Sequence, residues 1–217
     1  MTCPSTKGRF IAFEGGEGTG KSTQARLLAE ALAARGIDID VTREPGGTPG
    51  AEAIRTLLLH PPGDGWAAEA EALLFAAARS DHVARRIRPA IAAGTWVVCD
   101  RFVDSSRAYQ GGAGGLGDGA ICRLHEFGSA GLRPDLTILL AVDEAHIARR
   151  LAQRDGDGSD AIGGRSADYH RAVAECFRDL AQADPAGFAM VDGEGDPQAV
   201  HARVMEAVMP LLPARGE

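Results

Sequence analysis

The stretch FIAFEGGEGTGKST, residues Phe10–Thr23, passes from an apolar run into a glycine cluster and then into a lysine followed by two hydroxyls. Gly15, Gly20, Lys21 and Ser22 fit the pattern G-x-x-x-x-G-K-[ST], between a predicted strand and a predicted helix, as that pattern requires. Glycines let the backbone direct its N–H groups toward a phosphate, and the following helix adds the positive end of its dipole. The stretch therefore predicts a phosphate-binding loop.

Within this loop we expect Lys21 to reach the β- and γ-phosphates of a nucleoside triphosphate and Ser22 to hold Mg²⁺ through its hydroxyl. Only Lys7 and Lys21 among the 23 basic residues are lysines. The whole loop is predicted to bind the nucleotide: Gly15, Gly16, Glu17, Gly18, Thr19, Gly20, Lys21, Ser22 and Thr23. GTPases, motor ATPases and small-molecule kinases all share such a loop. A GTPase usually reads guanine with an Asn-Lys-x-Asp segment, and this chain contains no asparagine.

Short aliphatic runs alternate along the chain with helical patterns. Strands are predicted over Arg9–Phe13, Ile37–Thr42, Thr95–Cys99, Leu136–Val142 and Phe188–Val191. Helices are predicted over Gln24–Ala34, Glu52–Leu59, Ala67–Ala93, Ala120–Phe127, Glu144–Ala152, Ser166–Ala183 and Pro197–Leu212. Such alternation implies right-handed crossovers and a parallel sheet covered on both faces. We expect an α/β fold with a five-stranded parallel sheet, and one domain spanning residues 1–217.

The composition points to a small-molecule partner in a reducing compartment. A net charge of −7 argues against nonspecific binding to nucleic acid or to an anionic membrane. Four widely spaced cysteines, without a CxxC pair, suggest neither zinc nor a disulfide framework: Cys3, Cys99, Cys122 and Cys176. The apolar run Phe10–Phe13 is too short for a signal peptide or a membrane span. We therefore expect a cytoplasmic protein without a nucleic-acid or membrane partner.

Three glycine-rich stretches interrupt the alternation: Pro45–Gly50, Gly111–Gly119 and Asp155–Gly164. The last stretch lies between two predicted helices and is a candidate for a mobile lid, at about residues 154–165. A solvated turn is the alternative reading of the same composition.

Further motifs follow the second and third predicted strands. Because ligands collect at the carboxyl ends of strands in an α/β sheet, VTREPGGT and the segment from Trp96 to Gly112 should converge on the phosphate loop. On the helix between them, Phe75 and Arg79 share a face, so a base could stack on the ring and accept hydrogen bonds from the guanidinium. A core phenylalanine beside an arginine that extends toward solvent gives the same pattern.

The pair Asp100–Arg101 ends the third predicted strand. Asp100 stands where a carboxylate would hold Mg²⁺ directly or through water, and Arg101 could bridge the phosphates of the donor and the acceptor. A surface salt bridge at the end of a strand is the alternative reading.

Taken together, five motifs resemble those of bacterial thymidylate kinases, which are P-loop nucleoside monophosphate kinases. They are EGGEGTGKST, TREPGGT, FAAARSDHV, DRFVDSSRAYQGG and RPDLTILLAVD, in that order, and the resemblance runs from Phe10 to about Ala183. It implies a three-layer P-loop kinase fold with a short lid, and transfer of the γ-phosphoryl group of ATP to dTMP with Mg²⁺, giving dTDP and ADP for dTTP biosynthesis. It also implies a homodimer, through the predicted helix Ala67–Ala93.

The resemblance assigns roles at both ends of dTMP. Arg55 and Arg101 would grip the monophosphate with Glu44 nearby, and Glu17 would face the sugar hydroxyl. Phe75 would stack on thymine. Arg79 would donate to thymine O4, where cytosine carries an amine, and Tyr109 would pack against the deoxyribose and crowd a ribose 2′-hydroxyl. The base pocket would further be lined by Ser105, Ser106 and Gln110.

The lid departs from the pattern of the family. Thymidylate kinases with glycine at the position of Gly18 resemble the type that supplies cationic help from the lid, commonly through an Asp-Arg-x-Glu segment. The corresponding stretch here is Asp160–Gly163, which has no arginine. Arg154, before the lid, and Arg165, after it, are the two candidates for this catalytic role.

The acceptor phosphate is already anionic, so alignment and charge neutralisation should supply most of the rate acceleration. Two competing functions remain open. A kinase of another nucleoside monophosphate, or of a deoxynucleoside, would differ around Phe75, Arg79 and Tyr109. A noncatalytic ATP-binding module would bind Mg²⁺ and ATP but would need neither an acceptor arginine set nor a lid.

Overall fold

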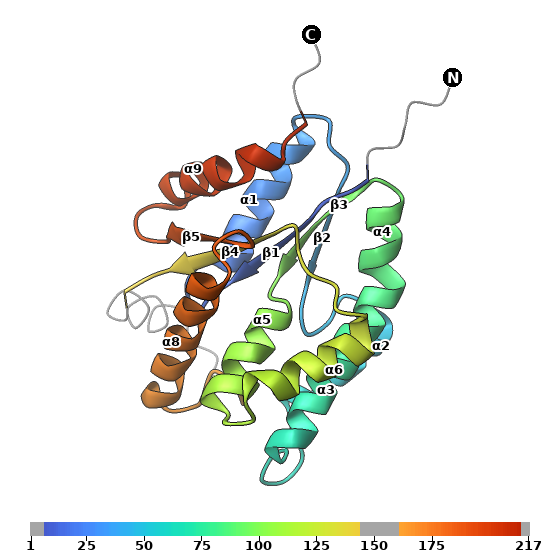
Figure 1. Ribbon diagram of the computed structural model, residues 1–217, viewed down its shortest axis with the longest axis vertical. Helices are drawn as coiled ribbons and strands as arrows, with labels where there is room; N and C mark the ends of the chain where they lie inside the picture. The colour runs from blue at the N-terminus through green and yellow to red at the C-terminus, as the bar shows by residue number, and fades with distance from the viewer. Residues whose placement is uncertain (1–6, 144–160, 214–217) are drawn as a thin grey trace.

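The computed structural model describes residues 7–143 and 161–213. Its centre is one five-stranded sheet of order β2-β3-β1-β4-β5, in which every neighbouring pair is parallel (Figure 1). The strands are β1 (Phe10–Glu14), β2 (Ile39–Arg43), β3 (Trp96–Asp100), β4 (Leu136–Ala141) and β5 (Phe188–Asp192). The five-stranded parallel sheet expected from the sequence is confirmed, with strand boundaries within about two residues of the predicted ones.

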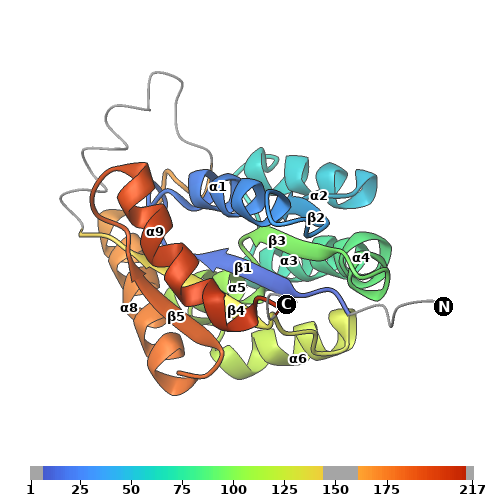
Figure 2. The same cartoon turned by 90° about the horizontal axis from the view of Figure 1, so that it is seen from above.

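Alternate residues of each strand pack on opposite faces of the sheet. Ile11 and Phe13 of β1 face the helices α1 (Lys21–Ala33) and α9 (Pro197–Val208), in one apolar cluster with residues of β3, β4 and β5. Phe10 and Ala12 face the opposite layer. Both faces are therefore covered, as the continuous apolar runs of these strands require, and Figure 2 shows helices on both sides of the sheet.

The opposite layer contains the longest helical run. It consists of α3 (Ala68–His82), the π-helical turn η1 (Val83–Ile87) and α4 (Arg88–Ala92), and it matches the single helix predicted over nearly the same residues. The remaining described helices are α2 (Pro49–Leu59), α5 (Val103–Ser106), η2 (Arg107–Ala113), α6 (Asp118–Ser129), α8 (Ala167–Ala183) and the short η3 (Met209–Leu211). Of these, α2 and α6 pack against α3, and α8 packs against η2.

Local signals fix where several helices begin. Gly20 has φ of 96°, in the left-handed region that favours glycine, and it directly precedes α1. This helix begins at Lys21, three residues before the predicted start. The side chains of Thr48, Ser166 and Asp196 accept backbone N–H groups at the starts of α2, α8 and α9. Such caps replace hydrogen bonds that the first helical turn lacks.

The helical segment from Val103 to Ala113 was not predicted, and its last glycines, Gly111 and Gly112, were assigned to a glycine-rich stretch that interrupts the alternation. The start of this helical segment is held by the buried carboxylate of Glu14, which accepts the backbone N–H groups of Phe102 at 2.8 Å and Ser105 at 2.9 Å. This cap comes from β1 and is invisible in the local sequence. The helix predicted over residues 144–152 and the lid residues 154–160 lie outside the described residues.

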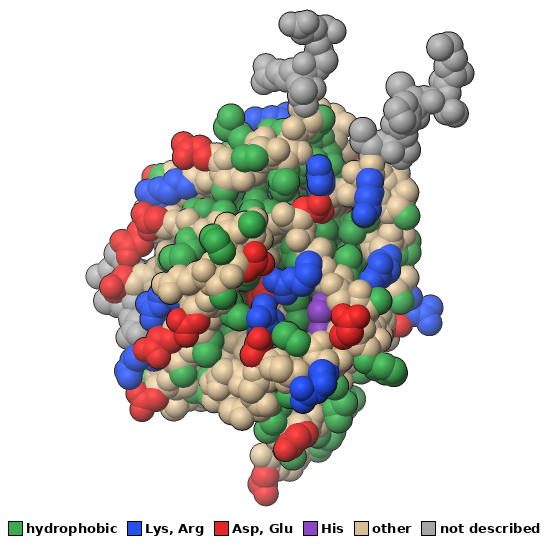
Figure 3. All heavy atoms as spheres, in the orientation of Figure 1, with side chains coloured by type: hydrophobic (Ala, Val, Ile, Leu, Met, Phe, Trp, Pro, Cys, Tyr) green, Lys and Arg blue, Asp and Glu red, His purple; other side chains and the backbone are tan. Residues whose placement is uncertain are grey.

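On the molecular face drawn in Figure 3, acidic and basic side chains are interspersed rather than gathered by sign. Within the described part of the chain, no helix combines the length and the apolar character needed to cross a bilayer.

Candidate active site

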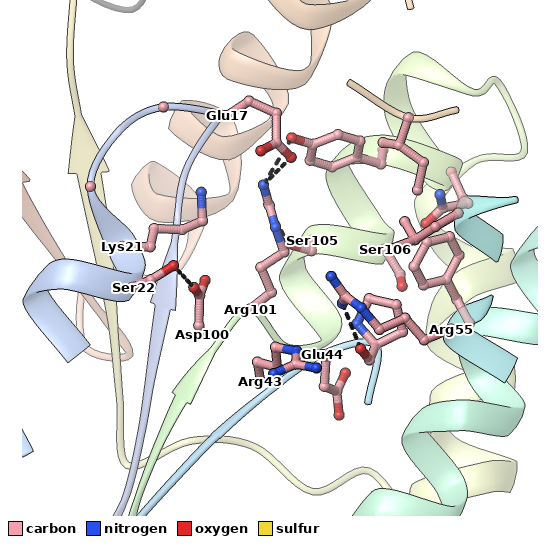
Figure 4. Close-up of a pocket in the computed structure, with 18 of the residues that line it drawn as sticks. Glu17, Lys21, Ser22, Arg43, Glu44, Arg55, Asp100, Arg101, Ser105 and Ser106 are labelled. Atoms are coloured by element: carbon pink, nitrogen blue, oxygen red, sulfur yellow. Dashed lines mark hydrogen bonds and ion pairs between the residues drawn. The ribbon is translucent and has the colours of Figure 1, made fainter. Parts of the chain in front are cut away.

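A cavity of about 550 Å³ opens where β1, β2 and β3 end, and it collects residues from the phosphate loop, the segment after β2, α3 and the segment after β3. In Figure 4, Lys21 and Ser22 lie on one side, Arg55 and Ser106 lie on the other, and Arg101 lies between them. The residues predicted to bind substrate that line this cavity are Glu17, Glu44, Arg55, Phe75, Arg101, Ser105, Ser106, Tyr109 and Gln110.

The phosphate loop is tightly folded around Lys21. The ammonium of Lys21 is buried and donates to Gly16 O at 2.6 Å. Burial, together with the nearby Arg101, lowers the pKa of Lys21 to about 8. Gly15 has φ of 138°, and a Cβ there would lie 2.8 Å from Leu140 O, so only glycine fits beside β4. The loop thus holds one cation against the start of α1.

Ser22 and Asp100 form a pair of hard oxygen ligands. Ser22 Oγ donates to Asp100 Oδ2 at 2.5 Å. The other carboxylate oxygen, Asp100 Oδ1, is buried and accepts no hydrogen bond within the described residues. In the same part of the chain no three His, Cys, Asp or Glu side chains cluster as metal ligands. The pair therefore fits Mg²⁺, which binds through one or two protein oxygens, water and substrate phosphates rather than in an all-protein cage.

Arg101 occupies the centre of the cavity in a strained backbone conformation. Its φ of 69° lies in the left-handed region, which is unusual for a residue with a side chain. Its guanidinium donates to Glu17 at 2.6 Å and to Ser105 Oγ at 3.1 Å. Ser105 in turn donates to Glu14 Oε2 at 2.6 Å. This chain of contacts fixes the cation between the phosphate loop and α5.

Glu14 supports that arrangement from below the cavity. Its side chain is fully buried, and burial, with the nearby carboxylate of Asp104, raises the pKa of Glu14 to about 7. Three hydrogen bonds from Phe102 N and from Ser105 N and Oγ compensate for the burial of this group. The sequence indicated no role for Glu14, because its partners follow a different strand.

Two more arginines line the acceptor side of the cavity. Arg55, on α2, donates to Pro45 O at 2.7 Å. Arg43, at the end of β2, lines the cavity and contacts both oxygens of Glu52 at 3.1 Å. Arg43 was not predicted, although it is the arginine of the quoted TREPGG motif.

Phe75, Tyr109 and Gln110 also line this cavity. Arg79 does not line the cavity. It is 3% exposed, and it donates to Glu44 at 2.7 Å and to Ser106 Oγ at 2.8 Å. Both of these partners do line the cavity, so Arg79 stands directly behind its wall.

A buried histidine completes this network. His82 Nδ1 lies 3.0 Å from Glu44 Oε1, and His82 Nε2 lies 2.8 Å from Thr42 Oγ1. Glu44 therefore accepts from both Arg79 and His82, and it joins the end of β2 to α3.

A smaller cavity of about 280 Å³ lies on the other side of the phosphate loop. Gly18, Thr19 and Gly20 form one wall, and the segment after β5, with Gly193 and Gly195, forms the other. The sequence analysis missed this wall. The glycine-rich segment that follows the last strand was the available signal, since ligands collect at strand ends.

Comparison with known proteins decides the family. The thymidylate kinase family model matches residues 13–204. The chain belongs to the thymidylate kinase family. A thymidylate kinase of Rhizorhabdus wittichii is 59% identical, over 95% of this chain and 99% of that protein. One of Rhodopseudomonas palustris is 47% identical, over 97% of this chain and 94% of that protein. The crystal structure of thymidylate kinase from Ehrlichia chaffeensis matches 94% of this chain and 100% of that chain, with a TM-score of 0.75 and 30% identity.

Membership of the thymidylate kinase family confirms the resemblance that the motifs indicated, and the solved relative confirms the fold class. The lid arginines are the part of the thymidylate kinase pattern that is altered here. Arg154 lies outside the described residues. Arg165 does not line the cavity: it ion-pairs with Glu71, and it donates to Tyr169 Oη at 2.5 Å.

Proposed function

We propose that this chain transfers the γ-phosphoryl group of ATP to dTMP, giving dTDP and ADP for dTTP biosynthesis. The proposal rests on one observation in a member of the thymidylate kinase family. Lys21 of the phosphate loop and the acceptor-side arginines Arg55 and Arg101 line the same cavity, which has a volume of about 550 Å³. A single cavity with cations on both sides suits two anionic nucleotides that must meet end to end.

The donor end uses the phosphate loop, Gly15 to Thr23. Lys21 neutralises the β- and γ-phosphates, and backbone N–H groups of the loop bind the remaining phosphate oxygens. Ser22 and Asp100 would hold Mg²⁺, and the ion would supply charge neutralisation of the ATP phosphates. The adenine base and ribose of ATP occupy the cavity of about 280 Å³ between the phosphate loop and the segment after β5, because that cavity adjoins the loop on the side away from the acceptor.

The acceptor end uses Arg55 and Arg101 to bind the monophosphate of dTMP, with Arg43 as an additional cation at the same end. Glu17, ion-paired with Arg101 at 2.6 Å, faces the sugar hydroxyl. Arg101 is the cation between the two phosphoryl groups, which lowers their mutual repulsion in the transition state.

At the base end, thymine stacks on the ring of Phe75, and Tyr109 packs against the deoxyribose. Arg79 acts from behind the cavity wall: it donates to Glu44 and to Ser106, and it thereby holds two residues of the pocket lining in place. The donation to thymine O4 that the resemblance implies would require its guanidinium to enter the cavity. Ser105, Ser106 and Gln110 complete the pocket.

Arg154 and Arg165 remain the candidates for lid cations. The contacts of Arg165 with Glu71 and Tyr169 support an anchoring role for this residue. Arg101 and Lys21 are then the cations that reach the transferred group from the described residues.

An ATP-coupled assay over dTMP, dUMP, dCMP, dGMP and dAMP tests the function. We expect the largest kcat/KM with dTMP. Preference for another monophosphate would identify the kinase alternative, and nucleotide binding without transfer to any acceptor would identify a binding module.

Two further proposals concern the assembly and the location of the protein. We propose one kinase domain that forms a homodimer through α3 and α6, because Leu73 and Phe127 are 56% and 95% exposed on these adjacent helices. A Cβ at Gly128 would lie 3.4 Å from Ser80 Cβ and 3.6 Å from Ala76 O, so α6 packs closely on α3 next to Phe127. The outward side of these two helices, with Leu73 and Phe127, is called the α3–α6 surface. We propose a cytoplasmic location because the described cysteines are free thiols and the reaction consumes ATP.

A further inference from the structure

Glu71 is a half-buried carboxylate at the edge of the base pocket, and neither the motifs nor the proposed reaction gives it a role. It lies on α3, one turn before Phe75, and its side chain is 13% exposed. One oxygen, Oε1, accepts from Gln110 Nε2 at 2.9 Å. The other, Oε2, accepts from Arg165 Nη2 and pairs with that cation. Glu71 thus links Gln110, which lines the cavity, to Arg165, which lies just before α8.

The chemistry of this contact fixes the orientation of the Gln110 amide. An ionised carboxylate only accepts hydrogen bonds, so the amide must present its nitrogen to Glu71; the reverse orientation would set two acceptors against each other. Arg165 Nη2 donates to the other oxygen, Glu71 Oε2, which leaves Oε1 to accept from Gln110. Gln110 is 4% exposed and lines the cavity. Its Oε1 accepts no hydrogen bond from the described residues, and it is the amide atom left for a ligand in the cavity.

An acceptor at this place discriminates between pyrimidines. Thymine and uracil carry a hydrogen-bond donor at N3, between two carbonyl acceptors, whereas cytosine carries an acceptor at N3 and an amine at C4. A fixed carbonyl oxygen can therefore accept from thymine N3–H but would meet the lone pair of cytosine N3. A site built to pair with a substrate N–H strongly rejects the analogue that lacks it, because a buried polar group is then left unpaired.

We propose that Glu71 is a specificity-determining positioning residue, which locks the Gln110 amide with its oxygen toward the base and thereby selects pyrimidines that carry an N3–H. Arg165 acts in the same unit by holding the second oxygen of Glu71. Two further hydrogen bonds hold Arg165 in place. Arg165 donates to Tyr169 Oη, and Tyr169 Oη donates to Tyr109 O at 2.8 Å. The inference rests on the proposed function for the identity of the ligand, a pyrimidine monophosphate.

The test substitutes Glu71→Gln, which preserves the shape of the side chain but can donate as well as accept, so that the Gln110 amide is free to reverse. The matched control is Glu69→Gln, the same change at an exposed position of the same helix. Both variants and the parent protein are assayed for kcat/KM and for dissociation constants with dTMP, dUMP and dCMP, and unfolding midpoints are measured alongside.

For Glu71→Gln we expect the dTMP to dCMP ratio of kcat/KM to fall by about tenfold, which corresponds to one discriminating hydrogen bond. The dTMP to dUMP ratio should stay within about twofold, because both bases carry N3–H, and kcat with saturating dTMP should change less than KM. Glu69→Gln should leave every ratio unchanged. In a Gln110→Leu background, Glu71→Gln should have no further effect on the dTMP to dCMP ratio.

Two results would overturn the role of Glu71: a dTMP to dCMP ratio that stays within about twofold of the parent value, or an equal loss with all three substrates, which indicates a packing defect. The dissociation constants keep the test separate from the proposed function. A parent protein that binds dTMP but transfers no phosphate contradicts the proposed kinase activity, whereas its binding ratios still decide the role of Glu71.

Discussion

At the scale of single residues, the cavity combines side chains of contiguous motifs with side chains such as Glu14 and Glu71, whose hydrogen-bond partners lie far away in the chain. Lys21, Asp100 and Phe75 lie in motifs whose chemistry can be named without a fold. Glu14 and Glu71 could not be found in this way, because their partners Phe102 and Arg165 are 88 and 94 residues distant in the chain. Such pairings depend on strand order and helix packing, which periodicity does not specify.

The lowered pKa of Lys21 gives a prediction at this scale. Burial and Arg101 lower the pKa of Lys21 to about 8, and the triphosphate of ATP should raise it again by favouring the charged form. Below pH 8 the lysine is charged with and without ATP, so this group adds no pH dependence. Above pH 8, binding must take up a proton, and the affinity for ATP should fall by up to about tenfold per pH unit. Calorimetric titrations between pH 7 and 10 measure this dependence.

Lys21→Met should bind ATP more weakly and lose that pH dependence, whereas Lys7→Met, which changes the only other lysine, should behave like the parent protein. Lys7 is exposed and far from the loop in sequence. A parent affinity that stays constant from pH 8 to 10 would show that Lys21 keeps the same charge state in the free and bound protein.

At the scale of elements, the five strands and most helices were predictable because their apolar runs and caps are local. The helical segment α5–η2 was not, since its glycines contradict helix propensity while Glu14 and the packing of α8 impose the helix. This segment carries Tyr109 and Gln110, which line the cavity. Tertiary contacts therefore decide the local structure in this part of the cavity wall.

Gly114, which ends η2, tests this dependence. A Cβ at Gly114 would lie 2.7 Å from Gln110 O and 2.9 Å from Tyr109 O, which are backbone atoms that cannot rotate away. We expect Gly114→Ala to lower the free energy of unfolding by roughly 1–3 kcal/mol and to lower kcat/KM for dTMP. Gly119→Ala on α6 is the control: its Cβ would meet only Arg123 at 3.6 Å, and it should be neutral or slightly stabilising. Chemical denaturation measures both, and equal stability of the two variants would contradict the steric argument.

At the scale of the whole molecule, the strand order brings three chain segments to one edge of the sheet. The ends of β1, β2 and β3 are neighbours, so the phosphate loop, the TREPGG segment and the Asp100–Arg101 pair meet although more than 50 residues separate some of them. The sequence predicted this convergence from the general behaviour of parallel sheets. It did not predict the cavity behind the phosphate loop, because the short segment after β5 matches no binding motif, although its glycines follow a strand end.

The exposed apolar side chains on α3 and α6 lead to a prediction about assembly. Phe127 on α6 is 95% exposed, and Leu73 on the adjacent helix α3 is 56% exposed. Large exposed apolar side chains on two packed helices are a favourable centre for an interface between two copies of the chain. We expect the protein to sediment as a dimer at micromolar concentration and Phe127→Glu to shift it to monomer, because a two-fold interface would bring both introduced carboxylates into the same apolar contact. Met209→Glu, at an exposed apolar residue outside these helices, should leave the dimer intact. Sedimentation velocity over a range of concentrations measures the oligomeric state of each variant. A parent protein that stays monomeric, or a Phe127→Glu variant that stays dimeric, would rule out the α3–α6 surface as the interface.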